Sequence, residues 1–204
     1  MTPEWGGALG GCPSAVLELL GGEAAGRLVA YVRLVERWNR AVGLVGGGMT
    51  ANRLWGLVEE TLAALPYLPS DGKLLDVGSG NGIPAIPLLV ARPHLEGLLL
   101  EPRERRWAFL REMVRELRLH AEVRRDRLSS RVGSGFAVLT VRGVERSQWE
   151  DVAAAALVAT GVVVWWTGGA MVKDPPRGGK MHVVRYPLPA TGRGAFLVWS
   201  PCST

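Results

Sequence analysis

The chain has 204 residues, with 24 lysines and arginines against 19 acidic residues and a formal net charge of +5. This length supports one domain with a hydrophobic core of its own and leaves room for a small additional segment. No apolar run reaches the roughly 20 residues of a membrane-spanning helix, and the N-terminus lacks the basic-then-apolar pattern of a secretion signal. These features exclude a membrane-spanning protein and favour a cytoplasmic one without a membrane partner.

Cysteine and histidine usage argues against a metal site or a disulfide framework. The two cysteines, Cys12 and Cys202, lie near opposite ends of the chain. The three histidines, His94, His120 and His182, are scattered and have no metal-ligand spacing. We expect the histidines on the surface or at strand ends, and no bound metal.

The first third of the chain is predicted to be helical. Apolar residues recur at helical spacing over residues 16–42, which predicts one or two amphipathic helices. A second helical stretch covers residues 51–65 and ends at Pro66 and Pro69. The sequence therefore predicts an N-terminal helical cap over residues 1–69.

From residue 73 onward, strands and helices alternate, which is typical of an α/β fold with a parallel sheet. Strands are predicted over residues 73–77, 97–101, 121–125, 136–141 and 162–166, with helices after Pro84, over 103–117 and over 147–158. Two last strands, 181–186 and 195–199, have no long helix between them and predict an antiparallel terminal hairpin. Residues 70–204 are thus expected to form a seven-stranded doubly wound, Rossmann-like sheet.

The most informative stretch runs from Leu74 to Pro84, where an apolar strand meets a glycine-rich turn and then a helix. Glycines at 78, 80 and 82 allow a tight turn and a close approach of backbone to ligand. Their G-x-G-x-G spacing differs from the G-x-G-x-x-G fingerprint of dinucleotide sites. In an α/β sheet, a turn at the carboxyl end of the first strand marks the ligand crevice.

The acidic residues at the strand ends indicate the type of ligand. Asp76 near the end of the first strand suits a cationic ligand better than a pyrophosphate, and S-adenosylmethionine carries an amino group and a sulfonium. Glu101 ends the next strand, where an acidic residue accepts hydrogen bonds from ribose hydroxyls in nucleotide folds. A nicotinamide-dependent oxidoreductase and a glycine-rich turn without a ligand remain the alternatives.

Arginines outnumber lysines and gather in residues 103–111 and 115–131, with Arg142 and Arg146 beyond. Arginine forks bind phosphate bidentately and stack on bases. Glu104, Glu112 and Glu116 are interleaved with them, as on a solvated helix face. The pattern leaves two interpretations open: contact with a polyanion, including a non-enzymatic RNA-binding module, or a solvated surface.

The stretch from Leu75 to Pro84, followed by Ile86-Pro87 and Arg92-Pro93, resembles the GidB/RsmG family of class I S-adenosylmethionine-dependent methyltransferases. These enzymes methylate guanine N7 in small-subunit ribosomal RNA. The residues that carry the weaker part of the resemblance are Trp38-Asn39, Leu100-Glu101 with Arg105-Arg106, Phe109-Leu110, Leu117-Arg118-Leu119 and Val141-Arg142-Gly143-Val144. The resemblance covers about residues 28–199. It implies S-adenosylmethionine as cofactor and 16S ribosomal RNA or the small ribosomal subunit as partner, and we take the chain as a monomer.

Several positions depart from the pattern of the resembled family. They are Gly43-Leu44-Val45 for Asn-Leu-Thr, Leu57 for His with Glu60-Thr61 for Asp-Ser, Thr167-Gly168 for Lys-Gly, and a segment near Asp126-Arg127-Leu128 for Arg-Ala-Glu, where the acidic group of the family is missing or displaced to Asp126. In the family these positions face or brace the methyl-transfer pocket. The departures motivate a second hypothesis, a degenerate member that binds the cofactor or RNA without transferring a methyl group.

The resemblance assigns roles to particular residues. Guanine N7 has a free lone pair, so methyl transfer needs no general base, and Arg142 is the candidate catalytic residue, hydrogen-bonding guanine O6 or a phosphate. The cofactor would be bound by Asp76, Gly78, Ser79, Gly80, Gly82, Ile83 and Glu101, with Asp126, Arg127 and Leu128 at the adenine edge. Trp165 and Trp166 leave two roles open, stacking on a base and core packing, and core packing is the simpler role for either.

Overall fold

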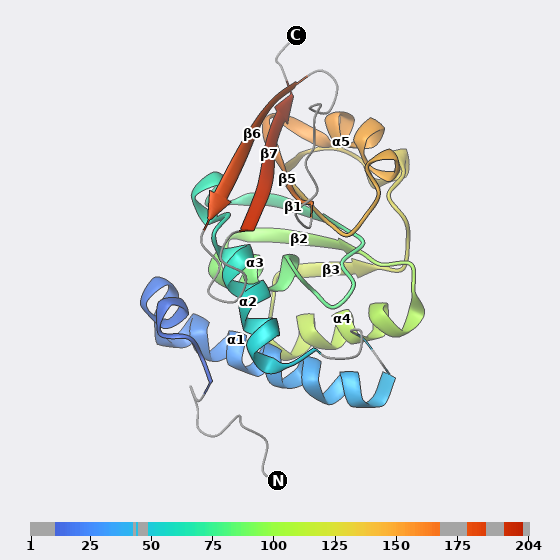
Figure 1. Cartoon of the computed structure of the whole chain (residues 1–204). Coiled ribbons are helices and arrows are strands. Elements are labelled where there is room, and N and C mark those ends of the chain that lie inside the picture. The colour runs from blue at the N-terminus through green and yellow to red at the C-terminus, as the bar shows by residue number, and fades with distance from the viewer. Residues whose placement is uncertain (1–10, 43, 45–48, 168–178, 187–193, 202–204) are drawn as a thin grey trace.

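The computed structural model describes residues 11–42, 44, 49–167, 179–186 and 194–201. At its centre is a seven-stranded sheet with strand order β3-β2-β1-β4-β5-β7-β6 (Figure 1). The strands β1 to β5 pair in parallel, and β7 pairs antiparallel with β5 and with β6. The predicted α/β fold is confirmed. The strand order changes direction at β1, beside β4, which is where open α/β sheets form their ligand crevice.

The elements fall close to the predicted ranges. The strands are β1 (Gly72–Val77), β2 (Leu95–Leu100), β3 (Ala121–Arg124), β4 (Phe136–Arg142), β5 (Leu157–Trp166), β6 (Gly179–Tyr186) and β7 (Gly194–Pro201). The helices are α1 (Ser14–Val42), α2 (Ala51–Leu62), α3 (Ala85–Ala91), α4 (Glu104–Glu116) and α5 (Glu150–Ala156). Pro87 lies in the first turn of α3, where it costs no internal hydrogen bond.

The sheet has a hydrophobic core on each face, because successive side chains of a strand point to opposite sides. Leu74 of β1 belongs to the core formed with α1, α2, α3 and α4, whereas Leu75 belongs to the core formed with α5. Figure 1 shows α1 and α4 on one side of the sheet and α5 on the other. Both faces are therefore covered, as a doubly wound sheet requires.

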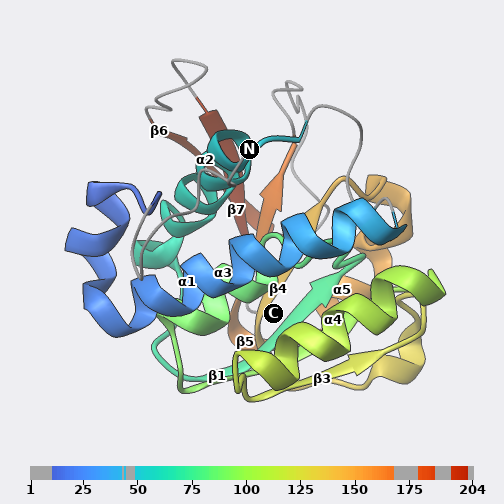
Figure 2. The same cartoon turned by 90° about the horizontal axis from the view of Figure 1, so that it is seen from below.

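The N-terminal helices pack directly on the sheet. Leu28 of α1 and Val58 of α2 are fully buried in the same core as Leu74. In Figure 2, α1 runs across α3 and alongside α4, and Arg27 of α1 donates a hydrogen bond of 2.6 Å to the carbonyl of Leu117. The hydrophobic core is thus continuous across the proposed boundary at residue 69, and the division into cap and sheet domain stays a prediction.

The largest difference from the predicted elements lies between β4 and β5. The helix predicted over residues 147–158 is shorter, because a 3-10 turn precedes α5 and the chain becomes extended at Leu157. Leu157 pairs with Phe136, and the register then shifts so that Val138 pairs with Val162. Strand β5 therefore begins five residues before the predicted start, through an irregular segment that contains Gly161.

Candidate active site

The glycine-rich turn after β1 adopts a backbone that only glycine tolerates well. Gly78 has a φ of 71° and Gly82 a φ of 92°, both in the left-handed region. A Cβ on Gly78 would lie 2.7 Å from Cγ2 of Val144, the second residue after β4. The backbone at residue 78 is therefore held close to the end of the neighbouring strand, and a side chain there would force the two apart.

The carboxylate of Glu101, just after β2, fastens this turn. Its Oε2 accepts a hydrogen bond of 2.9 Å from the N–H of Gly80, and its Oε1 accepts one of 2.8 Å from the N–H of Arg103. The N–H of Ser79 also donates to the Leu100 carbonyl at 3.0 Å. Glu101 is 3% exposed and still lines the cavity described below. Since a carboxylate offers about four lone-pair sites, it retains acceptor capacity for a ligand.

Asp76 lies in β1, two residues before the first glycine of the turn, and is fully buried. The Thr140 hydroxyl donates a hydrogen bond of 2.6 Å to its Oδ1, while Oδ2 is buried without a hydrogen-bond partner. Burial raises the pKa of Asp76 to about 6, although the hydroxyls of Ser79 and Thr140 close to its carboxylate oppose the shift. Asp76 does not line the cavity, so a contact with a ligand would have to pass through an intervening group. Its binding role stays a prediction.

The N-terminal helical segment supports the same turn from the other side. The phenol of Tyr31 in α1 is fully buried and donates a hydrogen bond of 2.8 Å to the carbonyl of Asn81. Burial, reinforced by the nearby charge of Asp76, raises the pKa of Tyr31 far above its ordinary value. Tyr31 therefore remains a protonated donor, and α1 helps to fix the shape of the turn.

A cavity of about 380 Å³ opens at the carboxyl ends of β1, β2 and β4, within the size range of ligand sites. Five of the predicted site residues line it: Gly78, Glu101, Asp126, Arg127 and Leu128. The other cofactor-binding candidates, Ser79, Gly80, Gly82 and Ile83, belong to the adjoining turn and do not line the cavity. The lining residues that the sequence did not single out as site residues are Val77, Leu100, Pro102, Arg103, Arg106, Gly143, Val144 and Gln148. Most of them lie at or just after the ends of β1, β2 and β4, which could have indicated them, since these strand ends meet at one edge.

Charges of both signs face this cavity. Glu101 and Asp126 provide carboxylates, and Arg103, Arg106 and Arg127 provide guanidinium groups. Nη1 of Arg106 lies 3.8 Å from the position that a Cβ on Gly80 would occupy, so this side chain reaches the glycine turn. The cavity is therefore suited to a ligand that carries an ammonium or hydroxyl groups together with a carboxylate or phosphate.

Arg142, the candidate catalytic residue, ends β4 and does not line the cavity, although the next residue, Gly143, does. Its Nη1 lies 2.7 Å from Oε2 of Glu60 in α2. Glu60 is one of the positions that depart from the resembled family. Two more, Leu57 and Thr61, contact each other in α2, where the Thr61 hydroxyl donates to the Leu57 carbonyl at 2.9 Å. The departures at Gly43, Val45 and Gly168 lie outside the described residues.

The two tryptophans at the end of β5 pack against other rings. Trp166 is 2% exposed, with its ring centre 5.5 Å from that of Phe196. Trp165 is half-buried and meets Trp149 edge-on at 5.2 Å. These contacts favour core packing for Trp166 and leave only part of Trp165 accessible.

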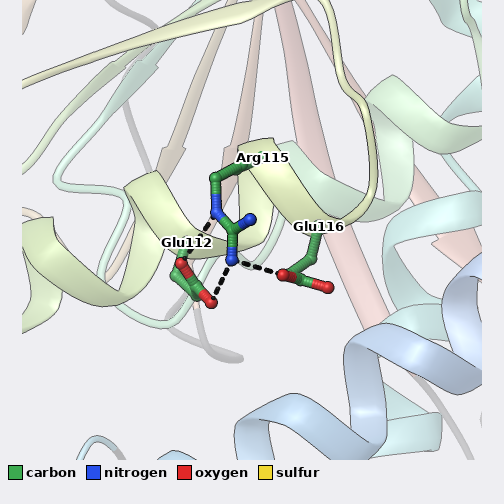
Figure 3. Close-up of polar contacts among 3 residues, drawn as sticks. All are labelled: Glu112, Arg115 and Glu116. Atoms are coloured by element: carbon green, nitrogen blue, oxygen red, sulfur yellow. Dashed lines mark hydrogen bonds and ion pairs between the residues drawn. The ribbon is translucent and has the colours of Figure 1, made fainter.

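One arginine of α4 and one of β3 are paired with carboxylates on the surface. Arg115 donates to Glu112 at 2.8 Å and also contacts Glu116 (Figure 3). Its hydrogen bond lowers the pKa of Glu112. Arg124 similarly pairs with Glu122 at 2.7 Å. These pairs match the solvated-surface interpretation for this part of the basic cluster, whereas Arg103, Arg106 and Arg127 face the cavity.

A second cavity, of about 880 Å³, is lined mainly by apolar side chains of α1, α2 and α3. It contains none of the predicted site residues, and we place the chemistry in the smaller cavity because the glycine turn and the charged groups are there.

His94, His120 and His182 are exposed. Over the described ranges, no group of three or more His, Cys, Asp or Glu is arranged to hold a metal ion, and no helix has the length and apolar character of a membrane span.

Comparisons with known proteins identify relatives of this chain. A protein named ribosomal RNA small subunit methyltransferase G from Alkalilimnicola ehrlichii is 44% identical over 97 residues, covering 48% of this chain and 44% of that protein. Its counterpart from Acidothermus cellulolyticus is 40% identical over 118 residues, covering 57% of this chain and 53% of that protein. The aligned part of this chain thus spans about half the length of these curated relatives.

Solved structures share the fold at low sequence identity. A methyltransferase from Geobacter sulfurreducens superposes with a TM-score of 0.59 at 14% identity, covering 85% of this chain and 89% of that one. A mutant of MtNAS in complex with S-adenosylmethionine gives a TM-score of 0.59 at 15% identity, covering 87% and 79%. The model of the family described as GidB, rRNA small subunit methyltransferase G, matches residues 24–174, which is most of the sequence. This chain therefore belongs to the GidB family.

Proposed function

We propose that the protein is an S-adenosylmethionine-dependent methyltransferase that acts on 16S ribosomal RNA of the small subunit, at guanine N7. The observation that carries the proposal is the cavity at the carboxyl edge of the sheet, where the glycine turn, Glu101 and three arginines come together. Family membership and the names of the relatives support the same activity.

The residues of the cavity fit the cofactor. Glu101 retains acceptor capacity for ribose hydroxyls beside the turn that it fastens. Asp126, whose carboxylate accepts a hydrogen bond of 2.7 Å from the Arg127 N–H, lies with Leu128 where an adenine edge would be read. Arg106 offers a cation beside the glycine turn for the carboxylate of the amino-acid end. When bound, S-adenosylmethionine supplies a methyl group on an electrophilic sulfonium.

The protein's part in the transfer is positioning. The substrate nitrogen must lie about 3 Å from the methyl group, with water excluded. N7 of guanine carries a free lone pair, so no side chain has to remove a proton. This agrees with exposed histidines that lie away from the cavity. Arg142, at the carboxyl end of β4, would hydrogen-bond guanine O6 or a neighbouring phosphate.

Two measurements test the proposal. Thermal shift with S-adenosylmethionine should raise the melting temperature, since a ligand that binds only the folded state stabilises it. Labelled cofactor should then transfer its methyl group to small ribosomal subunits from a strain that lacks this activity. Binding without incorporated label would favour the degenerate, non-transferring member that the departures at Leu57 and Thr167 suggest. Absence of both results would overturn the assignment.

A further inference from the structure

The side chain of Arg142 is held by an acid from a distant part of the chain. Glu60 Oε2 in α2 lies 2.7 Å from Arg142 Nη1 at the end of β4. Only 25% of the Arg142 side chain and 13% of the Glu60 side chain are exposed. Solvent and salt therefore screen this pair much less than the exposed pairs of α4.

The guanidinium of Arg142 is only partly satisfied by this contact. Nη1 is buried and makes no well-aligned hydrogen bond, although it lies within ion-pair distance of Glu60. A guanidinium carries five N–H donors in a planar fork, so one carboxylate leaves donors for a further acceptor. The two residues that follow, Gly143 and Val144, line the cavity. Arg142 thus ends β4 directly before residues that line the cavity, and its guanidinium has donors left for an acceptor of the substrate nucleotide.

We propose that Glu60 is a positioning residue, which orients the Arg142 guanidinium toward an oxygen acceptor of the substrate nucleotide. This inference rests on the proposed methyl transfer to RNA. An arginine side chain has many rotamers, and a fixed counter-charge selects those that keep the fork at the carboxyl edge of β4. The N-terminal helical segment would then serve both halves of the reaction. Tyr31 of α1 braces the glycine turn, and Glu60 of α2 sets the arginine for the substrate.

The competing explanation is that the ion pair only fastens α2 to the sheet. Loss of such a fastening would lower stability and reduce every activity in proportion to the folded fraction. Loss of a positioning contact would instead reduce methyl transfer while cofactor binding is retained, because Glu60 does not line the cofactor cavity.

The test compares Glu60→Gln and Glu60→Asp with Glu59→Gln in the full chain. Glu59 is the preceding residue of α2 and lines the other, apolar cavity, so its variant makes the same chemical change away from Arg142. For each variant, we would measure the melting temperature, the Kd of S-adenosylmethionine by calorimetry, and kcat and KM for methyl transfer to small subunits. Binding of 16S RNA without cofactor is measured in parallel.

We expect Glu60→Gln to lower kcat by about tenfold to a hundredfold, the effect of a misplaced reacting group, with the cofactor Kd unchanged. Glu60→Asp keeps the charge and should recover most of the rate, and Glu59→Gln should match the wild type. Equal loss of cofactor binding and rate, or full activity of Glu60→Gln, would overturn the inference.

If the wild type transfers no methyl group, the proposed function itself fails. The role of Glu60 is then decided by RNA binding, which must weaken in Glu60→Gln and not in Glu59→Gln.

Discussion

The Glu101 carboxylate accepts a hydrogen bond of 2.9 Å from the backbone N–H of Gly80. This contact joins the end of β2 to the turn after β1, so the acidic residue of one strand fixes the loop of its neighbour. The same carboxylate lines the cavity beside that loop. Glu101 therefore shapes the glycine turn, and we propose that it also contacts the cofactor.

Replacing Glu101 should weaken cofactor binding strongly. In Glu101→Gln, the uncharged amide can accept from only one of the two N–H groups, and hydrogen bonds to charged groups contribute about 1.5–3 kcal/mol each. We expect the Kd of S-adenosylmethionine to rise at least about tenfold and the melting temperature to fall. Calorimetry provides the measurement, with Glu104→Gln as control, because Glu104 is exposed and has only a 3.5 Å contact with Arg125. Equal affinities of the two variants would contradict the role of Glu101.

Gly78→Ala should disrupt the turn. Its φ of 71° is unfavourable for alanine, and the new Cβ would lie 2.7 Å from Val144 Cγ2. We expect a loss of about 1–3 kcal/mol in the free energy of unfolding, together with weaker cofactor binding. Urea denaturation gives the first quantity. Gly56→Ala in α2 is the matched control, since a Cβ there meets nothing within 4 Å, and it should stabilise the protein by about 0.5–1 kcal/mol. If both variants had the same stability, the steric argument for Gly78 would be wrong.

The buried Asp76 should make stability depend on pH. Burial raises the pKa of Asp76 from 3.8 to about 6, so between these values the folded state binds more protons than the unfolded state. Stability should therefore fall as pH rises from about 4 to 6, by roughly 2–3 kcal/mol from this group alone. Urea denaturation over this range measures the slope. Asp76→Asn should remove that part of the slope, while its hydrogen bond with Thr140 can persist. An unchanged slope in the variant would show that Asp76 does not titrate in this window.

Arg106 should contribute to the binding of the cofactor carboxylate. It lines the cavity and reaches the glycine turn, and a hydrogen bond between charged groups contributes about 1.5–3 kcal/mol. We expect Arg106→Gln to raise the Kd of S-adenosylmethionine by about tenfold and to reduce the effect of salt on binding. Arg105→Gln is the control, because the neighbouring Arg105 is exposed and does not line the cavity. A larger effect at Arg105 would contradict the assignment.

Most of the fold follows from local sequence patterns. The strand β1 and the glycine turn are apparent because an apolar run ends in glycines that only a tight turn requires. The start of β5 is not apparent, since residues 152–166 form one apolar stretch in which helix and strand patterns look alike. Only the pairing of Leu157 with Phe136 settles where the helix ends.

The site residues that lie at strand ends could be predicted from the sequence. The contacts between residues far apart in the chain could not. Residues after β1, β2 and β3 meet at one edge of a parallel sheet, so Gly78, Glu101 and Asp126 could be expected together. No periodicity relates Glu60 to Arg142, and their contact depends on how α2 packs on the sheet. The sequence likewise could not show that Asp76 is fully buried and bonded to Thr140 of the neighbouring strand, and its contact with the cofactor stays a prediction.

Calorimetric titration with S-adenosylmethionine and with S-adenosylhomocysteine tests the central claim most directly. We expect one site per chain with a Kd in the micromolar range for both compounds, and weaker binding in Glu101→Gln. The claim would be contradicted if neither compound produced heat or a thermal shift while NADH bound at the same cavity.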